Sequence, residues 1–404
     1  MLQIGWIDFS SDHRDKVMSI LDSLKEQGAI DELGIGTIRD RLSDYLFPGI
    51  STIQTRAKYL LLIPWIIQYL ESRNVTSKNF INQLHELEYK FIDVLSEGNN
   101  NLGIIGRDSR GDLQRKPSSI YWYALRKYKI CKLDVTLNQY AELVDDVIAN
   151  KLKTTQELKV AEKDQLGDDR DSILDSRFQS FWNVCPPSTE NWLENLTIHL
   201  THQEATFLRE TIRLAVPDSL LAHLLSLDHL HKVEDFKSIE TVTAILPQFP
   251  EDLQEMLQLA LDFAQIIYGT NIRFNIIFNK INDRTSVNAE YEWKQWCYQM
   301  KNEFSFERWD TTVLFHKTNP DEATRTFVKR WIEFARSGNY DQTDEMDDWI
   351  RKREVYLKRA RAKLRINHQA NDQWIGLGKL TYRWNNVRTI LLDIQRGIES
   401  NVQT

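Results

Sequence analysis

Residues that break helices are scarce in this chain, and this scarcity most narrows the folds open to it. Only 15 Gly and 9 Pro occur among 404 residues, whereas the helix-favouring Leu, Lys, Glu and Gln are abundant. A sandwich or barrel of short strands needs frequent turns rich in Gly and Pro. The sequence therefore predicts a mainly α, multi-helical fold.

The length predicts more than one domain, because a single core seldom extends beyond about 250–300 residues. We expect an N-terminal helical domain at residues 1–152 and a polar connecting segment at 153–180. A middle helical domain at 181–289 and a Trp-rich C-terminal helical domain at 290–404 follow. The candidate functional residues fall in the first of these domains.

Charge and cysteine content set limits on the function. A net charge of -7 disfavours a protein that coats nucleic acid along its whole surface, but it permits a local basic patch. The three cysteines are far apart and form no Cys-x-x-Cys pair, which fits a reducing compartment. The start lacks the pattern of a signal peptide, and the most apolar run, residues 59–70, is too short to span a membrane. We expect a cytoplasmic protein without membrane contact.

Positive charge gathers between residues 103 and 132. This segment contains eight Lys or Arg against two Asp, so the rest of the chain carries a large net negative charge. Glycines let backbone N–H groups approach an anion, and Arg side chains match phosphate oxygens. Aromatic residues within the segment can stack on bases, as they do in proteins that bind single strands.

A helix beginning at Ser118 or Ser119 would add N–H groups that favour negative charge. Its start and length also suit the second helix of a winged-helix or helix-turn-helix-like element in residues 100–135. The candidate nucleic-acid-binding residues are Arg107, Arg110, Arg115, Lys116, Ser118, Ser119, Tyr121, Trp122, Arg126, Lys127 and Lys129.

A purely structural alternative explains the same segment. Ile120, Tyr123, Ala124 and Tyr128 recur at helical spacing and can form a core face, with the cations merely solvated on the opposite side. The sequence leaves both interpretations open.

A second basic cluster follows an acidic stretch between residues 341 and 365. Acidic residues at the start of a helix and basic residues at its end complement the helix dipole, so we expect a packing helix from residue 343 to about 366. Arg359, Arg361, Lys363 and Arg365 have no predicted partner within this helix and remain able to contact a polyanion.

Other motifs carry weaker signals. Gly34 and Gly36 match part of a dinucleotide fingerprint, but the third glycine is missing. The Glu88 and Lys90 pair has nuclease-type spacing, yet residues two apart on a helix point in different directions. The histidines lack further ligands at metal-site spacing; they are His199, His202, His229 and His231. We expect no catalytic residue, cofactor or metal site.

Several longer motifs carry a family resemblance. They are IGWIDFS at residues 4–10, GIGTIRD at 34–40, FPGISTIQTRAKY at 47–59 and PSSIYW at 117–122. With these motifs the chain resembles an uncharacterised bacterial domain-of-unknown-function family over nearly its whole length. Members occur beside helicases and phospholipase D-like nucleases in phage-defence gene neighbourhoods. The resemblance thus implies a role in a defence complex and implies no chemistry.

Taken together, these features favour a non-enzymatic subunit of an anti-phage complex that contacts the phosphates of DNA or RNA through residues 103–132. The first alternative is a protein-interaction scaffold whose Trp-rich final third recruits a helicase or nuclease partner. A metal-dependent nuclease is the third reading.

Overall fold

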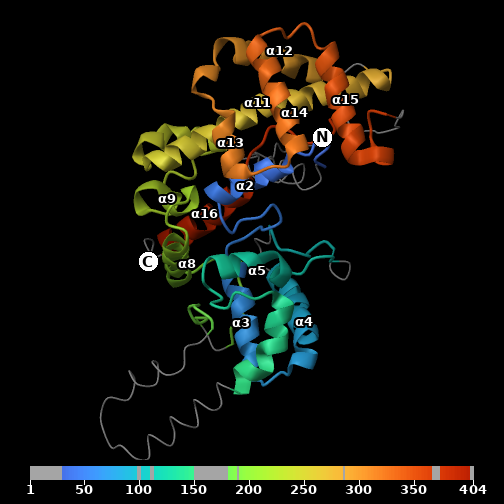
Figure 1. Cartoon of the computed structure of the whole chain (residues 1–404). Coiled ribbons are helices and arrows are strands. Elements are labelled where there is room, and N and C mark those ends of the chain that lie inside the picture. The colour runs from blue at the N-terminus through green and yellow to red at the C-terminus, as the bar shows by residue number, and fades with distance from the viewer. Residues whose placement is uncertain are drawn as a thin grey trace, which may run out of the picture. The chain divides into compact units, whose positions relative to one another are not determined.

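The computed structural model describes residues 30–97, 102–109, 113–149, 181–188, 191–284, 287–365 and 374–400 (Figure 1). These ranges are mainly helical, which confirms the predicted fold class. They contain no strand, and their one pairing of extended backbone is an isolated bridge between Cys131 and Trp182. None of the helices within them has both the length and the apolar character that crossing a bilayer requires.

The chain forms two compact units, and each is built from segments that are distant in sequence. Unit 1 comprises Met1–Phe47 and Phe236–Asn385, and unit 2 comprises Pro48–Asp235 and Asn386–Thr404. The three consecutive domains and the connecting segment expected from the sequence divide the chain differently and stay a prediction.

Unit 2 is organised around the apolar helix α3. Its helices are α3 (Tyr59–Ser72), α4 (Ser77–Ser96), α5 (Pro117–Lys127), α8 (His202–Ala215), α9 (Leu220–Leu224), α10 (Leu227–Leu230) and most of α16 (Trp384–Glu399). Residues 137–149 are also helical. Nearly every side chain of α3 is buried, because α4 and α5 both pack against it (Figure 1).

The remaining helices of unit 2 join through tight local contacts. Thr201 and Glu204 form a capping box at the start of α8, with each side chain accepting a backbone N–H of the other residue. Gly397 on α16 lies so close to α8 that a Cβ atom there would be 2.6 Å from the Cβ of Ala205. A glycine is therefore required where α16 crosses α8.

Unit 1 is built on one long helix, α11 (Glu251–Ile281). The other elements are α2 (Gly36–Leu46), η2 (Ile239–Gln248), α12 (Val287–Asn302), η3 (Phe306–Arg308), α13 (Thr311–Thr318), α14 (Glu322–Ser337), α15 (Asp344–Lys358) and η4 (Arg359–Arg361). Helices α2, α12, α14 and α15 all contact α11.

Tryptophans fill the core of unit 1 between α11, α12 and α14. Trp296 and Trp331 are 1% and 0% exposed, and their Nε1 atoms donate to the Gln265 and Ile266 carbonyls of α11. Their ring centroids are 5.6 Å apart. Gly269 provides the space for both rings, since a Cβ atom there would lie 2.5 Å from Trp296.

Within the described part of residues 100–135, α5 is the one helix, and a loop lies on each side of it. A helix-turn-helix element needs two helices joined by a short turn, and a winged helix also needs strands. Neither form is present in the described part of the segment, residues 102–109 and 113–135.

Candidate nucleic-acid interface

The start of α5 is anchored inside unit 2. Lys116 has an extended backbone, and Pro117 occupies the first helical position. The Ser118 N–H donates to Oε1 of Glu88 on α4 at 2.5 Å, and both residues are buried. The Glu88 carboxyl group therefore already occupies the N–H end of α5. This geometry removes Ser118 from the candidate phosphate contacts.

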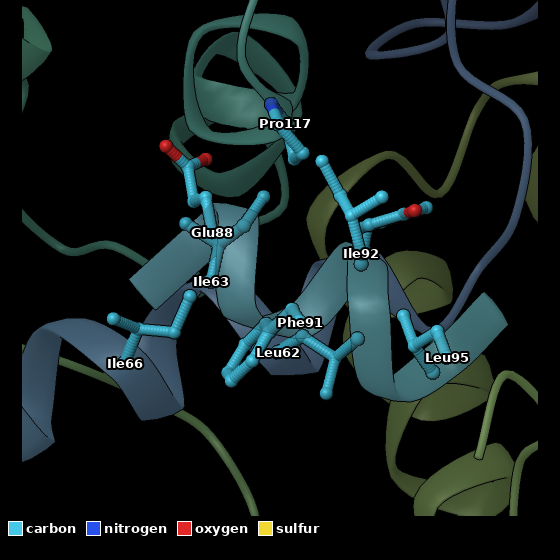
Figure 2. Close-up of a pocket in the computed structure, with 9 residues that line it drawn as sticks. Leu62, Ile63, Ile66, Glu88, Phe91, Ile92, Leu95 and Pro117 are labelled. Carbon is cyan, nitrogen blue, oxygen red and sulfur yellow. The ribbon is translucent and has the colours of Figure 1, made fainter. Parts of the chain in front are cut away.

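Burial determines the protonation of Glu88. The side chain is 1% exposed, and desolvation raises its pKa from 4.5 to about 7 in spite of the Ser118 N–H bond. Figure 2 shows Glu88 and Pro117 beside the apolar side chains of α3 and α4 that line a small cavity. The volume of this cavity, about 10 Å³, is the space of roughly one water molecule, so it is not a ligand site.

Two of the predicted stacking residues are core residues instead. The Tyr121 hydroxyl accepts the Thr55 and Arg56 N–H groups at 2.8 and 3.0 Å and donates to the Arg56 carbonyl. The Trp122 Nε1 donates to the Val135 carbonyl at 2.7 Å. Tyr121 is 0% exposed and Trp122 is 6% exposed, so neither ring is presented to a base. Sequence reasoning underestimated how much of α5 is buried.

Two of the candidate arginines are paired with the chain's own carboxylates. Arg107 lies 3.0 Å from Asp108, and Arg126 lies 2.8 Å from Asp134. Both carboxylates are highly exposed, at 86% and 91% of their side-chain surface. Exposed ion pairs of this kind contribute about 0–1 kcal/mol, so a phosphate can replace the carboxylate at little cost.

Lys116 also has internal partners, since its Nζ donates to the Tyr89 hydroxyl and to the Leu113 carbonyl. Its ammonium group lies over the Tyr89 ring, 4.1 Å from the centroid. Arg110 lies outside the described residues.

The remaining candidates are exposed on or beside α5. Ser119 and Lys127 are both exposed, and Tyr123, 48% exposed, lies midway between them at four-residue spacing. These three residues therefore share one face of the helix. Lys129, with φ of 59°, and Lys132 are exposed just after the helix, and Arg115 is exposed just before it. We call these six residues the α5 surface.

The cations of the α5 surface have little internal competition. Within the described ranges, no ion pair engages Arg115, Lys127, Lys129 or Lys132. Tyr123 supplies the exposed ring of this helix. The sequence offered Tyr123 both as a stacking residue, beside Tyr121 and Trp122, and as part of a core face, and only the pattern of solvent exposure along α5 separates the three rings.

Two buried ion pairs in the motif at residues 47–59 were not predicted. Arg56 binds Asp393 at 2.9 Å, and Lys58 binds Glu204 at 2.6 Å. All four side chains are 9% exposed or less. Burial lowers the pKa of Lys58, while Glu204 acts in the opposite direction.

These pairs also position the loop before the α5 surface. The Arg56 Nη1 donates to the Leu102 carbonyl at 2.8 Å, and the Thr55 hydroxyl donates to the Gly103 carbonyl. The role of both pairs is thus to attach the motif to α8, α16 and the loop at residue 102. Because Arg56 and Asp393 are hundreds of residues apart, no local pattern could reveal the pair.

The other predicted features divide between residues with partners in the chain and exposed residues. Lys363, in the second basic cluster, pairs with Glu32 at 2.9 Å, whereas Arg359, Arg361 and Arg365 are exposed. The His202 Nδ1 lies 2.8 Å from the Ile398 carbonyl. Nowhere in the described part of the chain do three His, Cys, Asp or Glu side chains lie in a position to hold a metal ion.

The chain matches one known family over nearly its whole length. Residues 1–395 match a family of unknown function (DUF6361), which confirms the resemblance to an uncharacterised domain family. No match was found among curated proteins or among solved structures. Because the match extends over almost all of the sequence, the protein belongs to the family of unknown function DUF6361.

Proposed function

We propose that this protein is a non-enzymatic nucleic-acid-binding subunit and that the α5 surface binds the phosphates of DNA or RNA. The observation that carries the proposal is the exposure of Arg115, Lys127, Lys129 and Lys132 around a single helix, without a carboxylate partner in the described ranges. Each such cation can replace a counterion on a phosphate backbone, and the release of counterions drives binding.

Tyr123 supports the same function. Its ring is 48% exposed, and it lies on the face of α5 that also presents Ser119 and Lys127. Stacking of a base on an exposed aromatic ring contributes about 1–3 kcal/mol and tolerates any base. The α5 surface thus combines backbone contacts with a stacking position, which favours single-stranded or unpaired nucleic acid.

A triple charge reversal tests this function. The variant Lys127→Glu, Lys129→Glu and Lys132→Glu should bind fluorescently labelled single-stranded DNA and RNA at least about tenfold more weakly. A matched control reverses Lys280, Lys294 and Lys301, three exposed lysines of unit 1. Both variants have the same net charge, so a general charge effect would weaken both equally. Equal affinity of the α5 variant and the wild type would reject the proposal.

Membership of an anti-phage complex is a further part of this proposal, and it rests on the family resemblance alone. Deletion of the gene from its native neighbourhood should then lower protection against phage. The triple reversal on α5 should reproduce that loss at normal protein abundance.

A scaffold function is the second candidate. The Trp side chains of the final third that were expected to anchor a partner include Trp296 and Trp331, which form the core of unit 1. Tyr291 and Tyr298, 60% and 58% exposed and seven residues apart on α12, are the better anchors. Replacing both by Ala should remove a helicase or nuclease partner from the purified complex, whereas unchanged co-purification would exclude this candidate.

A further inference from the structure

A groove of about 360 Å³ lies between α14 and α15 in unit 1. Its wall includes Ala323, Thr326, Phe327, Trp349, Arg353 and Tyr356. This volume is within the range of about 300–1,000 Å³ that is usual for small-molecule sites. The lining combines flat rings with two cations, Lys352 and Arg353, and one carboxylate, Glu322.

Arg353 is the central feature of this groove, because it is a buried cation on which the Asp321 and Asp31 carboxylates act electrostatically without forming a salt bridge. It is 7% exposed, and no ion pair engages it within the described ranges. Its Nε donates to the Leu33 carbonyl at 2.9 Å, and its Nη2 donates to the Thr324 hydroxyl at 2.8 Å. A buried charge normally has an opposite charge beside it, since desolvation of an unpaired charge is costly.

The guanidinium group of Arg353 is held in place but keeps a donor for a ligand. No acceptor in the described part of the chain binds its Nη1. The group lies over the Phe327 ring, 5.4 Å from the centroid. The Leu33 and Gly34 carbonyls, the Thr324 hydroxyl and the ring hold the guanidinium group in place, so a bound anion has less side-chain freedom to remove.

Aromatic side chains line the groove beside this cation. The Tyr356 side chain is 67% exposed. The Nε1 atom of Trp349 is buried and has no hydrogen-bond partner among the described residues. An unsatisfied buried donor is uncommon in folded proteins and calls for an acceptor that the chain does not supply.

We propose that the α14–α15 groove binds a small ligand in which one phosphate or carboxylate is attached to a flat ring, as in a nucleoside monophosphate. The anionic group pairs with Arg353, and the ring lies against Trp349 and Tyr356. Glu322 and Lys352 also line the groove, and Lys352 pairs with Asp348 at 2.6 Å, so the lining matches one anionic group on the ligand and disfavours a second. The groove belongs to unit 1, so this inference does not rest on the function proposed for the α5 surface of unit 2.

Calorimetry on the full chain tests the ligand class directly. The probes are AMP, GMP, CMP and UMP, with indole-3-acetate as a ring that carries a carboxylate, and with adenosine and inorganic phosphate as the separate parts. At least one complete probe should bind with a Kd between about 1 μM and 1 mM, and the separate parts should bind at least about tenfold more weakly. Preference for indole-3-acetate over the nucleotides would identify the carboxylate as the source of the anionic group.

Two rim variants locate the site without disturbing the buried arginine. Ala323→Trp fills the groove, and Tyr356→Ala removes an exposed part of its wall. Each variant should therefore raise the Kd of the best probe by about tenfold or more. The control is Tyr298→Ala, which removes a similarly exposed tyrosine from α12 outside the groove. It should leave the affinity within about twofold.

Arg353→Lys, made in the wild-type chain, should remove most of the affinity for the best probe, because an ammonium group cannot reproduce the guanidinium geometry. Its thermal unfolding is measured in parallel, since Arg353 also ties Leu33 and Thr324 together. Absence of binding by every probe, or unchanged binding by both rim variants, would overturn the proposal.

Discussion

At the scale of single residues, unit 2 is defined by charged side chains that are buried and compensated. Arg56 and Asp393 neutralise each other, whereas burial of Glu88 outweighs the effects of the Ser118 N–H and of the Lys116 charge, so the pKa of Glu88 is raised. Glu88 occupies a position in the apolar stripe of α4, so a hydropathy pattern marks it as an anomaly but cannot show its partner. These residues give two predictions on stability.

The first prediction concerns the pH dependence caused by Glu88. Its pKa is about 7 in the folded chain and 4.5 without burial, so the folded state binds the proton more tightly. Its contribution to stability is therefore complete below about pH 4.5 and is lost as the pH rises to about 7, by up to about 1.4 kcal/mol per pH unit.

Glu88→Gln should remove this loss, because the amide keeps an oxygen for the Ser118 N–H but has no proton to release. Urea unfolding of both proteins at several pH values measures the difference in unfolding free energy. We expect that difference to shift in favour of the variant between pH 5 and 7. A difference that is independent of pH would show that Glu88 does not titrate in this range.

The second prediction concerns the buried pair of Arg56 and Asp393. Asp393→Asn leaves the Arg56 guanidinium buried without a counter-charge, which should lower the unfolding free energy by about 3–5 kcal/mol. The control Asp108→Asn breaks the exposed pair with Arg107 and should cost about 1 kcal/mol or less. Similar losses in both variants, measured by urea unfolding, would contradict the structural role of the buried pair.

At the scale of elements, the sequence predicted helix starts better than it predicted buried faces or helix ends. The helix expected from residue 343 begins at Asp344, because the acidic residues that mark its start are a local signal. The helix expected to reach residue 366 ends at Lys358, where Arg359 has a φ of 52° and Glu354 accepts the N–H groups of Lys363 and Leu364. That turn depends on the Glu354 side chain, which accepts N–H groups beyond the end of the helix. Helical periodicity in the sequence carries no signal for such a contact.

Helix α5 shows the same limit for burial. A helix packed on one side has a narrow apolar stripe, but α5 packs on α3 and also places Trp122 against Tyr140 and Trp182. Its buried face is therefore wider than a simple pattern suggests. Tyr121 and Trp122 were predicted as surface residues for this reason, whereas Tyr123, which was considered both for base stacking and for the alternative core face, is the exposed ring.

A prediction at this scale concerns Gly269 in α11. Alanine is favoured over glycine within a helix by about 1 kcal/mol, but the added Cβ would lie 2.5 Å from Trp296 and 2.7 Å from Trp331. Hydrogen bonds to α11 hold both rings, so overpacking should outweigh the gain in helix propensity. We expect Gly269→Ala to lower the unfolding free energy by about 1–3 kcal/mol.

Gly378→Ala is the matched control, because nothing lies within 4 Å of a Cβ atom at that position. Its effect on urea unfolding should stay within about 0.5 kcal/mol. A stabilised Gly269→Ala variant would show that the Trp core can shift to accept the methyl group.

At the scale of the whole molecule, the sequence predicted a mainly α fold from its composition but could not predict which segments join. Each unit combines an N-terminal segment with segments that follow hundreds of residues later, and the pair of Arg56 and Asp393 is one such link. The local excess of positive charge could be predicted from the sequence, because it depends on composition alone. Which of its cations are exposed depends on tertiary packing and required the structure.

The central claim is that Lys127, Lys129 and Lys132 contact phosphates, and the salt dependence of binding tests it most directly. The measurement is the slope of log Kd against log salt concentration for a labelled single-stranded oligonucleotide, with the wild type and the triple reversal to Glu. Each phosphate contact on a single strand contributes about 0.7 to this slope. If each of the three lysines neutralises one phosphate, the slope should therefore be smaller by about 2 in the variant. Identical slopes for the two proteins would contradict the account.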